Sequence, residues 1–120
     1  MKKDITSRKD IEKLIFAFYE RLKTDKQLSQ HFAKTNWEKH LPVMYRFWEN
    51  AVFYTGSYDG NPMAVHQTIH KRKPLNMKLF SQWIKIFNST VDEMYSGEKA
   101  DLIKQKAYAI ATVMQLKILS

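Results

Sequence analysis

The chain has 120 residues and a mass of 14.3 kDa, which suffices for one domain with a single core. It is 44% hydrophobic and 13% aromatic with only 3 Gly and 3 Pro, which excludes collagen-like, linker-rich and turn-dense all-β proteins. The formal net charge of +8 favours an anionic partner. The basic residues are nevertheless spread along the chain, and the densest run is 71–73. We therefore interpret them as residues on solvated helix faces and expect no nucleic-acid partner.

Four segments carry apolar residues at helical spacing, and none alternates as a strand would. The first follows Ser7 and Asp10, which resemble a capping box. The second contains Pro42, which either marks its first turn or bends it, and Gly97 separates the third from the fourth. The pattern predicts an all-α protein with a single domain over 1–120. The apolar positions in chain order are Ile11, Leu14, Ile15, Phe18, Tyr19 and Leu22; Trp37, Leu41, Met44, Phe47, Trp48 and Val52; Phe80, Trp83, Ile84, Phe87, Val91 and Met94; Ala100, Ile103, Ala107, Ile110, Met114 and Ile118.

A short fifth helix is predicted over 63–70, between a loop rich in Gly, Asn and Pro at 54–62 and a polar stretch at 71–76. Short helices are not stable alone, so tertiary packing or a ligand must hold this one. It carries His66 and His70, two of the 4 histidines. Because the chain has no cysteine, disulfides, thiolate nucleophiles, iron–sulfur clusters and zinc fingers are excluded, and histidine is the soft metal ligand that remains.

Several apolar stripes carry polar side chains that need a partner when buried. Tyr19 and Trp83 lie on inner helix faces, and His40 lies near the start of the second helix. Each has an ordinary reading, in which the polar tip reaches solvent or a backbone carbonyl. His66 is either an amphipathic surface residue or an axial metal ligand, for instance of a haem, whose flat apolar surface would suit the many aromatic residues. A zinc site at His66 and His70 is disfavoured because no third ligand follows closely.

These residues lie in stretches that resemble the group III truncated haemoglobins. The matching segments are Phe16–Leu22, Trp37–Trp48, Tyr58–His66 and Phe80–Phe87, and they cover nearly the whole chain in order. The most specific part is the succession Trp-x-x-His-Leu-Pro, Gly-x-Pro-Met-x-x-His and Phe-x-x-Trp. The resemblance implies a shortened globin fold, a two-over-two helical sandwich around haem.

The resemblance also implies roles for individual residues. His66 matches the proximal ligand of the haem iron, with His70 as the alternative; Tyr19 and Trp83 match distal hydrogen-bond donors, and His40 matches a distal histidine. The other residues that we expect to contact haem are Phe18, Phe32, Met44, Phe47 and Trp48. The residues that we expect to contact the haem propionates are Lys71, Arg72 and His70.

The implied function is reversible binding of dioxygen or another diatomic ligand at haem b. Two hydrogen-bond donors suit ligand chemistry, such as detoxification of nitric oxide or peroxide, or sensing, better than bulk oxygen storage. Such chemistry needs an unidentified reductant, and we expect a monomer or weak dimer. No apolar run approaches the roughly 20 residues of a membrane span, and the stretch at 14–19 is too short for a signal peptide, so we expect a cytoplasmic protein with no membrane partner. The alternative is a cofactor-free basic helical module that binds nucleic acid or a protein partner.

Overall fold

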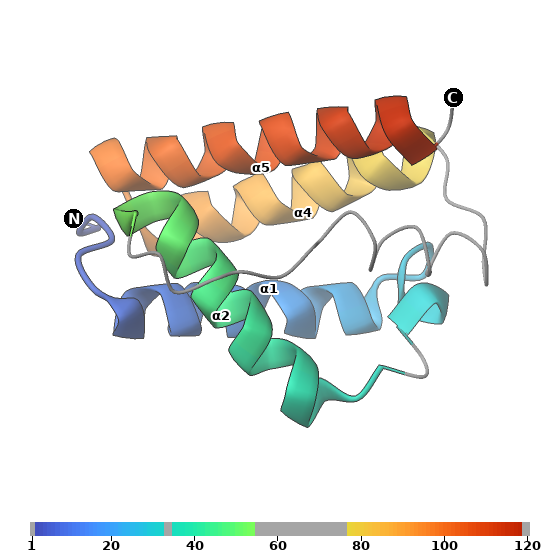
Figure 1. Cartoon of the computed structure of the whole chain (residues 1–120), viewed down its shortest axis with the longest axis horizontal. Helices are drawn as coiled ribbons and strands as arrows, with labels where there is room; N and C mark the ends of the chain where they lie inside the picture. Colours follow the sequence, from blue (N-terminus) through green and yellow to red (C-terminus); the bar gives the residue numbers. More distant parts are fainter. Residues whose placement is uncertain (1, 33–34, 55–76, 119–120) are drawn as a thin grey trace.

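The computed structural model describes residues 2–32, 35–54 and 77–118, and this part of the chain is helical without strands. Figure 1 shows α4 and α5 side by side, with α1 beneath them and α2 crossing the others. Contacts join α1 to α2, α4 to α5, α1 to α4 and α2 to α5, so two helix pairs pack against each other. The elements in chain order are α1 (Arg8–Thr24), the 3-10 helix η1 (Ser29–Phe32), α2 (Trp37–Phe53), α4 (Met77–Met94) and α5 (Glu98–Ile118).

The four predicted long helices are confirmed, and their apolar stripes form the core. In α1 all six positions of the predicted stripe are buried. In α2 the buried stripe residues are Met44, Trp48 and Val52, and the other three are partly buried. In α4 the stripe residues Phe80, Phe87 and Val91 are buried, and the other three are partly buried. Apolar spacing of three and four residues therefore predicted the inner faces of the helices correctly.

The predicted capping box at Ser7 is wrong. Ser7 precedes α1 in extended conformation, but its side chain makes no capping hydrogen bond. Asp10 instead accepts hydrogen bonds from the Thr6 amide at 2.9 Å and the Thr6 hydroxyl at 3.0 Å. The Lys3 ammonium and the Tyr95 hydroxyl also donate to its carboxylate. The carboxylate thus binds the segment before the helix. It also binds Tyr95 in the turn between α4 and α5, a partner that local sequence spacing could not reveal.

The turn between α4 and α5 is held by the N-terminal segment. The Ser96 amide donates to the Lys3 carbonyl at 3.0 Å. The Asp4 carboxylate accepts hydrogen bonds from the amides of Lys99 and Ala100, both at 2.9 Å, and so caps the N-terminus of α5. Gly97 has φ +139°, and a Cβ atom there would lie 2.5 Å from Asp4 Cγ. Only glycine therefore fits this turn without displacement.

Asp25 turns the chain after α1 and ties the turn to α4. Its carboxylate accepts hydrogen bonds from the Gln27 and Leu28 amides at 2.9 and 3.0 Å, and from Gln82 Nε2 at 2.9 Å. Leu28 is buried, and η1 follows within the stretch that the sequence predicted only as a link. The start of α2 lies close to the C-terminal half of α1, where Trp37 contacts Tyr19 and Lys23.

Candidate functional site

Aromatic rings from α1, α2 and α4 meet in one cluster inside the molecule. Phe18 makes edge-to-face contacts with Trp83, at 5.4 Å between ring centroids, and with Phe87, at 4.9 Å. Trp48 and Trp83 both stack on Phe87, at 5.0 and 5.7 Å. Rings in such offset and edge-to-face arrangements hold one another in orientation. The three helices thereby build an apolar wall from residues far apart in the sequence.

Phe87 is a member of this wall that the sequence analysis did not assign to the site. It is fully buried and contacts Phe18, Trp48 and Trp83. The available signal was its place one helical turn after Trp83 on the same stripe, which puts the two side chains on one face of α4. Helical spacing predicts an apolar inner position there, and the structure shows that Phe87 joins three predicted site residues.

A polar group of rings lies beside the wall, between α1 and the start of α2. Tyr19 is 5.3 Å from both Trp37 and His40, and Trp37 is 5.5 Å from His40, measured between ring centroids. Tyr19 also contacts Phe18 at 5.2 Å, so Phe18 touches both predicted donors, Tyr19 and Trp83. The structure therefore brings Tyr19 and His40 into contact, and Trp83 shares the neighbour Phe18 with Tyr19.

Tyr19 is buried, with 5% of its side chain exposed. Burial disfavours the charged phenolate and raises the pKa of the hydroxyl far above its usual value near 10. The hydroxyl is protonated at physiological pH, as an ordinary tyrosine hydroxyl already is, and burial shifts its pKa further in that direction. Its O–H is a neutral donor group in a setting where bulk water competes little for hydrogen bonds.

The remaining predicted haem contacts on α2 lie along the same helix. Met44 is buried one turn after His40 and one turn before Trp48, and Phe47 is partly buried in edge-to-face contact with Trp48 at 5.0 Å. The side chain of Phe32, in η1, lies outside the described residues, as does the predicted helix over 63–70. The other predicted site residues outside them are His66, His70, Lys71 and Arg72.

The chemistry of the described residues fits a flat apolar cofactor that binds a small polar ligand. The wall is aromatic and aliphatic, and the polar groups beside it are a hydroxyl, an indole N–H and an imidazole, none of them permanently charged. Within the described ranges no group of three or more His, Asp or Glu side chains is placed to hold a bare metal ion.

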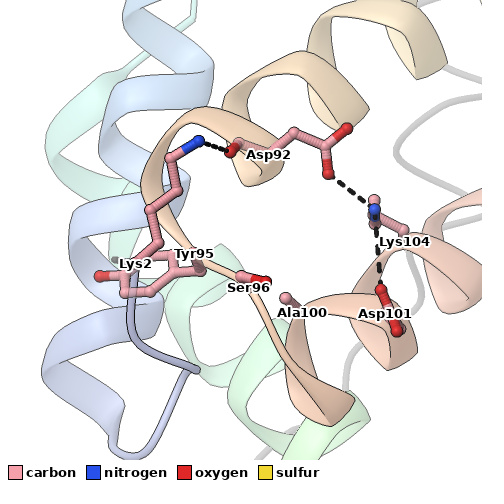
Figure 2. A pocket seen from close by; sticks show the side chains of 7 residues that line it. All are labelled: Lys2, Asp92, Tyr95, Ser96, Ala100, Asp101 and Lys104. Carbon is pink, nitrogen blue, oxygen red and sulfur yellow. Dashed lines mark hydrogen bonds and ion pairs between the residues drawn. The ribbon is translucent and has the colours of Figure 1, made fainter.

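A surface hollow of about 610 Å³ at the α4–α5 turn shares no residue with this cluster. Figure 2 shows the polar contacts of its charged side chains. Lys104 lies 2.6 Å from Asp92 and 3.8 Å from Asp101, and Lys2 donates to the Asp92 carbonyl at 2.6 Å. These contacts join the N-terminal segment, α4 and α5, and we interpret the hollow as part of that structural corner.

Comparison with known proteins gives concordant findings. The family model described as bacterial-like globin matches residues 3–117. The group 3 truncated hemoglobin ctb of Campylobacter jejuni is 28% identical over 121 residues, covering 96% of this chain and 93% of that protein. The crystal structure of the group III truncated hemoglobin from Campylobacter jejuni aligns with a TM-score of 0.85 and 27% identity, over 98% of this chain and 95% of that one. Among the helices described, none is long and apolar enough to cross a membrane.

Proposed function

Because the chain belongs to the bacterial-like globin family, we propose that it is a haem b protein whose own hydrogen-bond donors retain a polarised diatomic ligand, with dioxygen as the leading candidate. Haem binding and the binding of a small diatomic ligand follow from the family. Haem supplies, when bound, an iron atom with one open coordination position for such a ligand. The haem type, the ligand and the reaction are the finer part of the proposal.

His66 would hold the iron in this proposal. It stands in the Gly-x-Pro-Met-x-x-His motif, and neutral imidazole is a suitable ligand for iron. Lys71, Arg72 and His70 follow closely in the sequence and would pair with the propionates, since cationic side chains match carboxylates. The wall around Phe87 would exclude water from the opposite side of the pocket.

The contact of Phe18 with both Tyr19 and Trp83 carries the proposal. Both side chains can donate a hydrogen bond, and Tyr19 is buried, so that water competes little for its hydroxyl. A hydrogen bond to a ligand that gains negative character is worth about 1–2 kcal/mol in a partly dry pocket. Donors of this kind retain dioxygen more than carbon monoxide, because the electron density of dioxygen is more strongly displaced toward its outer atom.

Strong retention suits ligand chemistry or sensing better than the release of stored oxygen. Donors that polarise a bound ligand would equally support detoxification of nitric oxide or peroxide, with an unidentified reductant supplying electrons. His40, in edge contact with Tyr19 and Trp37, would control the polar side of the pocket. The absence of cysteine further supports a reducing compartment, and we propose a cytoplasmic location.

The substitutions Tyr19→Phe and Trp83→Phe test the two donors. Each should speed dioxygen dissociation from the haem-loaded protein by about five- to thirtyfold, the equivalent of 1–2 kcal/mol. Stopped-flow displacement of dioxygen by carbon monoxide measures the rate constant. Tyr108→Phe is the matched control, because Tyr108 is 65% exposed on α5 and should leave the rate unchanged. Unchanged rates in both pocket variants would refute the assignment of donors.

A further inference from the structure

Trp37 is placed at the junction of α1 and α2 by the cap of α2. Asn36 is the N-cap residue: its side chain accepts from the Lys39 amide, and its carbonyl accepts from the His40 amide at 2.9 Å. Trp37 is therefore the first residue of α2, and His40 follows three residues later on the same face. The backbone of this first turn therefore fixes the positions from which the side chains of Trp37 and His40 project.

On the facing helix, Tyr19 and Lys23 lie one turn apart on the same face of α1. The Lys23 ammonium lies 4.9 Å from the centroid of the Trp37 ring, within the range of a cation–π contact. It also pairs with Glu20 Oε1 at 2.8 Å. Lys23 and Trp37 are both half-buried, whereas Tyr19 behind Trp37 is buried.

We propose that Trp37, covered by Lys23, is a positioning residue that orients Tyr19 and His40 and closes the site at the α1–α2 junction. This inference rests on the proposed function, because it concerns the ligand that the site would hold. Trp37 touches both polar rings at 5.3 and 5.5 Å, so its indole restricts how far each can turn. Its half-buried position means that removing it opens a direct way for water between the two helices.

A second pair of the same chemistry at the other end of α2 offers a matched control. Lys106 lies 5.5 Å from the ring of Tyr54, the residue that follows the last turn of α2. The 17-residue helix separates this pair from Trp37 by about 25 Å. Lys23→Met and Lys106→Met each remove an ammonium from an aromatic ring and keep the aliphatic stem. They differ in whether that ring touches Tyr19.

The experiment measures dioxygen dissociation and carbon monoxide recombination in the haem-loaded protein. We expect Lys23→Met to raise both rates by about two- to fivefold, because this variant loses only the cation–π contact. Trp37→Ala should raise them by about tenfold or more, because it loses the whole indole ring. Trp37→Phe, which keeps an aromatic ring, should restore most of the wild-type rate. Lys106→Met should match the wild type.

A second measurement separates positioning from stability. The infrared stretching band of carbon monoxide in the pocket should broaden or split in Lys23→Met and Trp37→Ala, since mobile donors offer several environments, and it should stay single in Lys106→Met. Urea unfolding should show equal, small losses for the two lysine variants. If Lys23→Met and Trp37→Ala keep wild-type rates and bands while haem is bound, the positioning role is refuted. A chain that binds no haem would instead refute the proposed function.

Discussion

The side chain of Asp10 is only 4% exposed, and its carboxylate accepts hydrogen bonds from Thr6 and Lys3. Burial by itself would raise the pKa of this acid, but the hydrogen bonds and the nearby ammonium act in the opposite direction and prevail, holding its pKa at about 2. The neighbouring Tyr95 hydroxyl responds in the reverse sense: burial and the Asp10 charge raise its pKa to about 12. One buried charge therefore organises the start of α1 and its contact with the turn between α4 and α5.

The pKa of Asp10 predicts how stability depends on pH. Because the folded pKa lies below the unfolded value of about 3.9, the ionised carboxylate stabilises the fold above that pH, and the contribution disappears as pH falls toward 2. Asp10→Asn should therefore lower the free energy of unfolding by about 2 kcal/mol at pH 7 and by little near pH 2. Urea unfolding followed by circular dichroism from pH 7 to pH 2 measures the difference. The exposed Glu38, changed to Gln, serves as control; a loss in Asp10→Asn that is constant across this range would contradict the assignment.

Residue types and their spacing indicated which polar side chains are candidates for the site, but they did not predict all of the neighbours of these side chains. Tyr19, Trp83 and His40 stood out because a dry core seldom uses them, and Tyr19 and Trp83 do lie against Phe18. The parts played by Phe87 and Trp37 were missed, because each looks like an ordinary core position until α1, α2 and α4 are placed together.

At the scale of the element, the turn into α5 depends on one glycine. Gly97 has φ +139°, and a side chain there would collide with Asp4, whose carboxylate caps α5. Gly97→Ala should lower the free energy of unfolding by about 1–3 kcal/mol through backbone strain and loss of that cap.

Urea unfolding measures this loss against Ser96→Ala, the adjacent exposed position, whose backbone amide rather than side chain is used in the hydrogen bond to Lys3. The control should stay within about 0.5 kcal/mol of the wild type. If Gly97→Ala is as stable as Ser96→Ala, the close approach of Asp4 does not constrain the turn.

The helices themselves were predictable from sequence because apolar period depends on neighbours only three or four residues away. Their ends were less so. The cap expected from Ser7 is absent, while α5 is capped by Asp4, more than ninety residues earlier in the chain. Such a partner has no local signature, since only the packing of the N-terminal segment against the α4–α5 turn brings it there.

At the scale of the whole molecule, the resemblance to truncated haemoglobins predicted the arrangement that the structure has. Contacts of α1 with α2 and of α4 with α5 form the two pairs, and the match to the Campylobacter jejuni structure extends over 98% of this chain. Hydrophobic period alone could not have chosen this topology, because four amphipathic helices pack in several ways. The order of short motifs along the chain supplied the missing constraint.

The net charge of +8 does not identify a partner in this arrangement. Several of the basic residues pair with acids on the same or adjacent helices, as Arg8 does with Glu12 and Lys104 with Asp92. Exposed pairs of this kind contribute little to stability and mainly keep the surface solvated. Of the basic residues, we propose that Lys71 and Arg72 pair with the haem propionates.

Titration of the purified chain with haemin, followed by absorption spectroscopy, tests the central proposal most directly. We expect saturation at one haem per chain with a Soret band that shifts on reduction and again on adding carbon monoxide. His66→Ala should lose stable binding, whereas His70→Ala should retain it. A wild-type chain that takes up no haemin would contradict the proposal that the protein binds haem. Binding that is unaffected by His66→Ala and abolished by His70→Ala would contradict the assignment of His66 as the iron ligand.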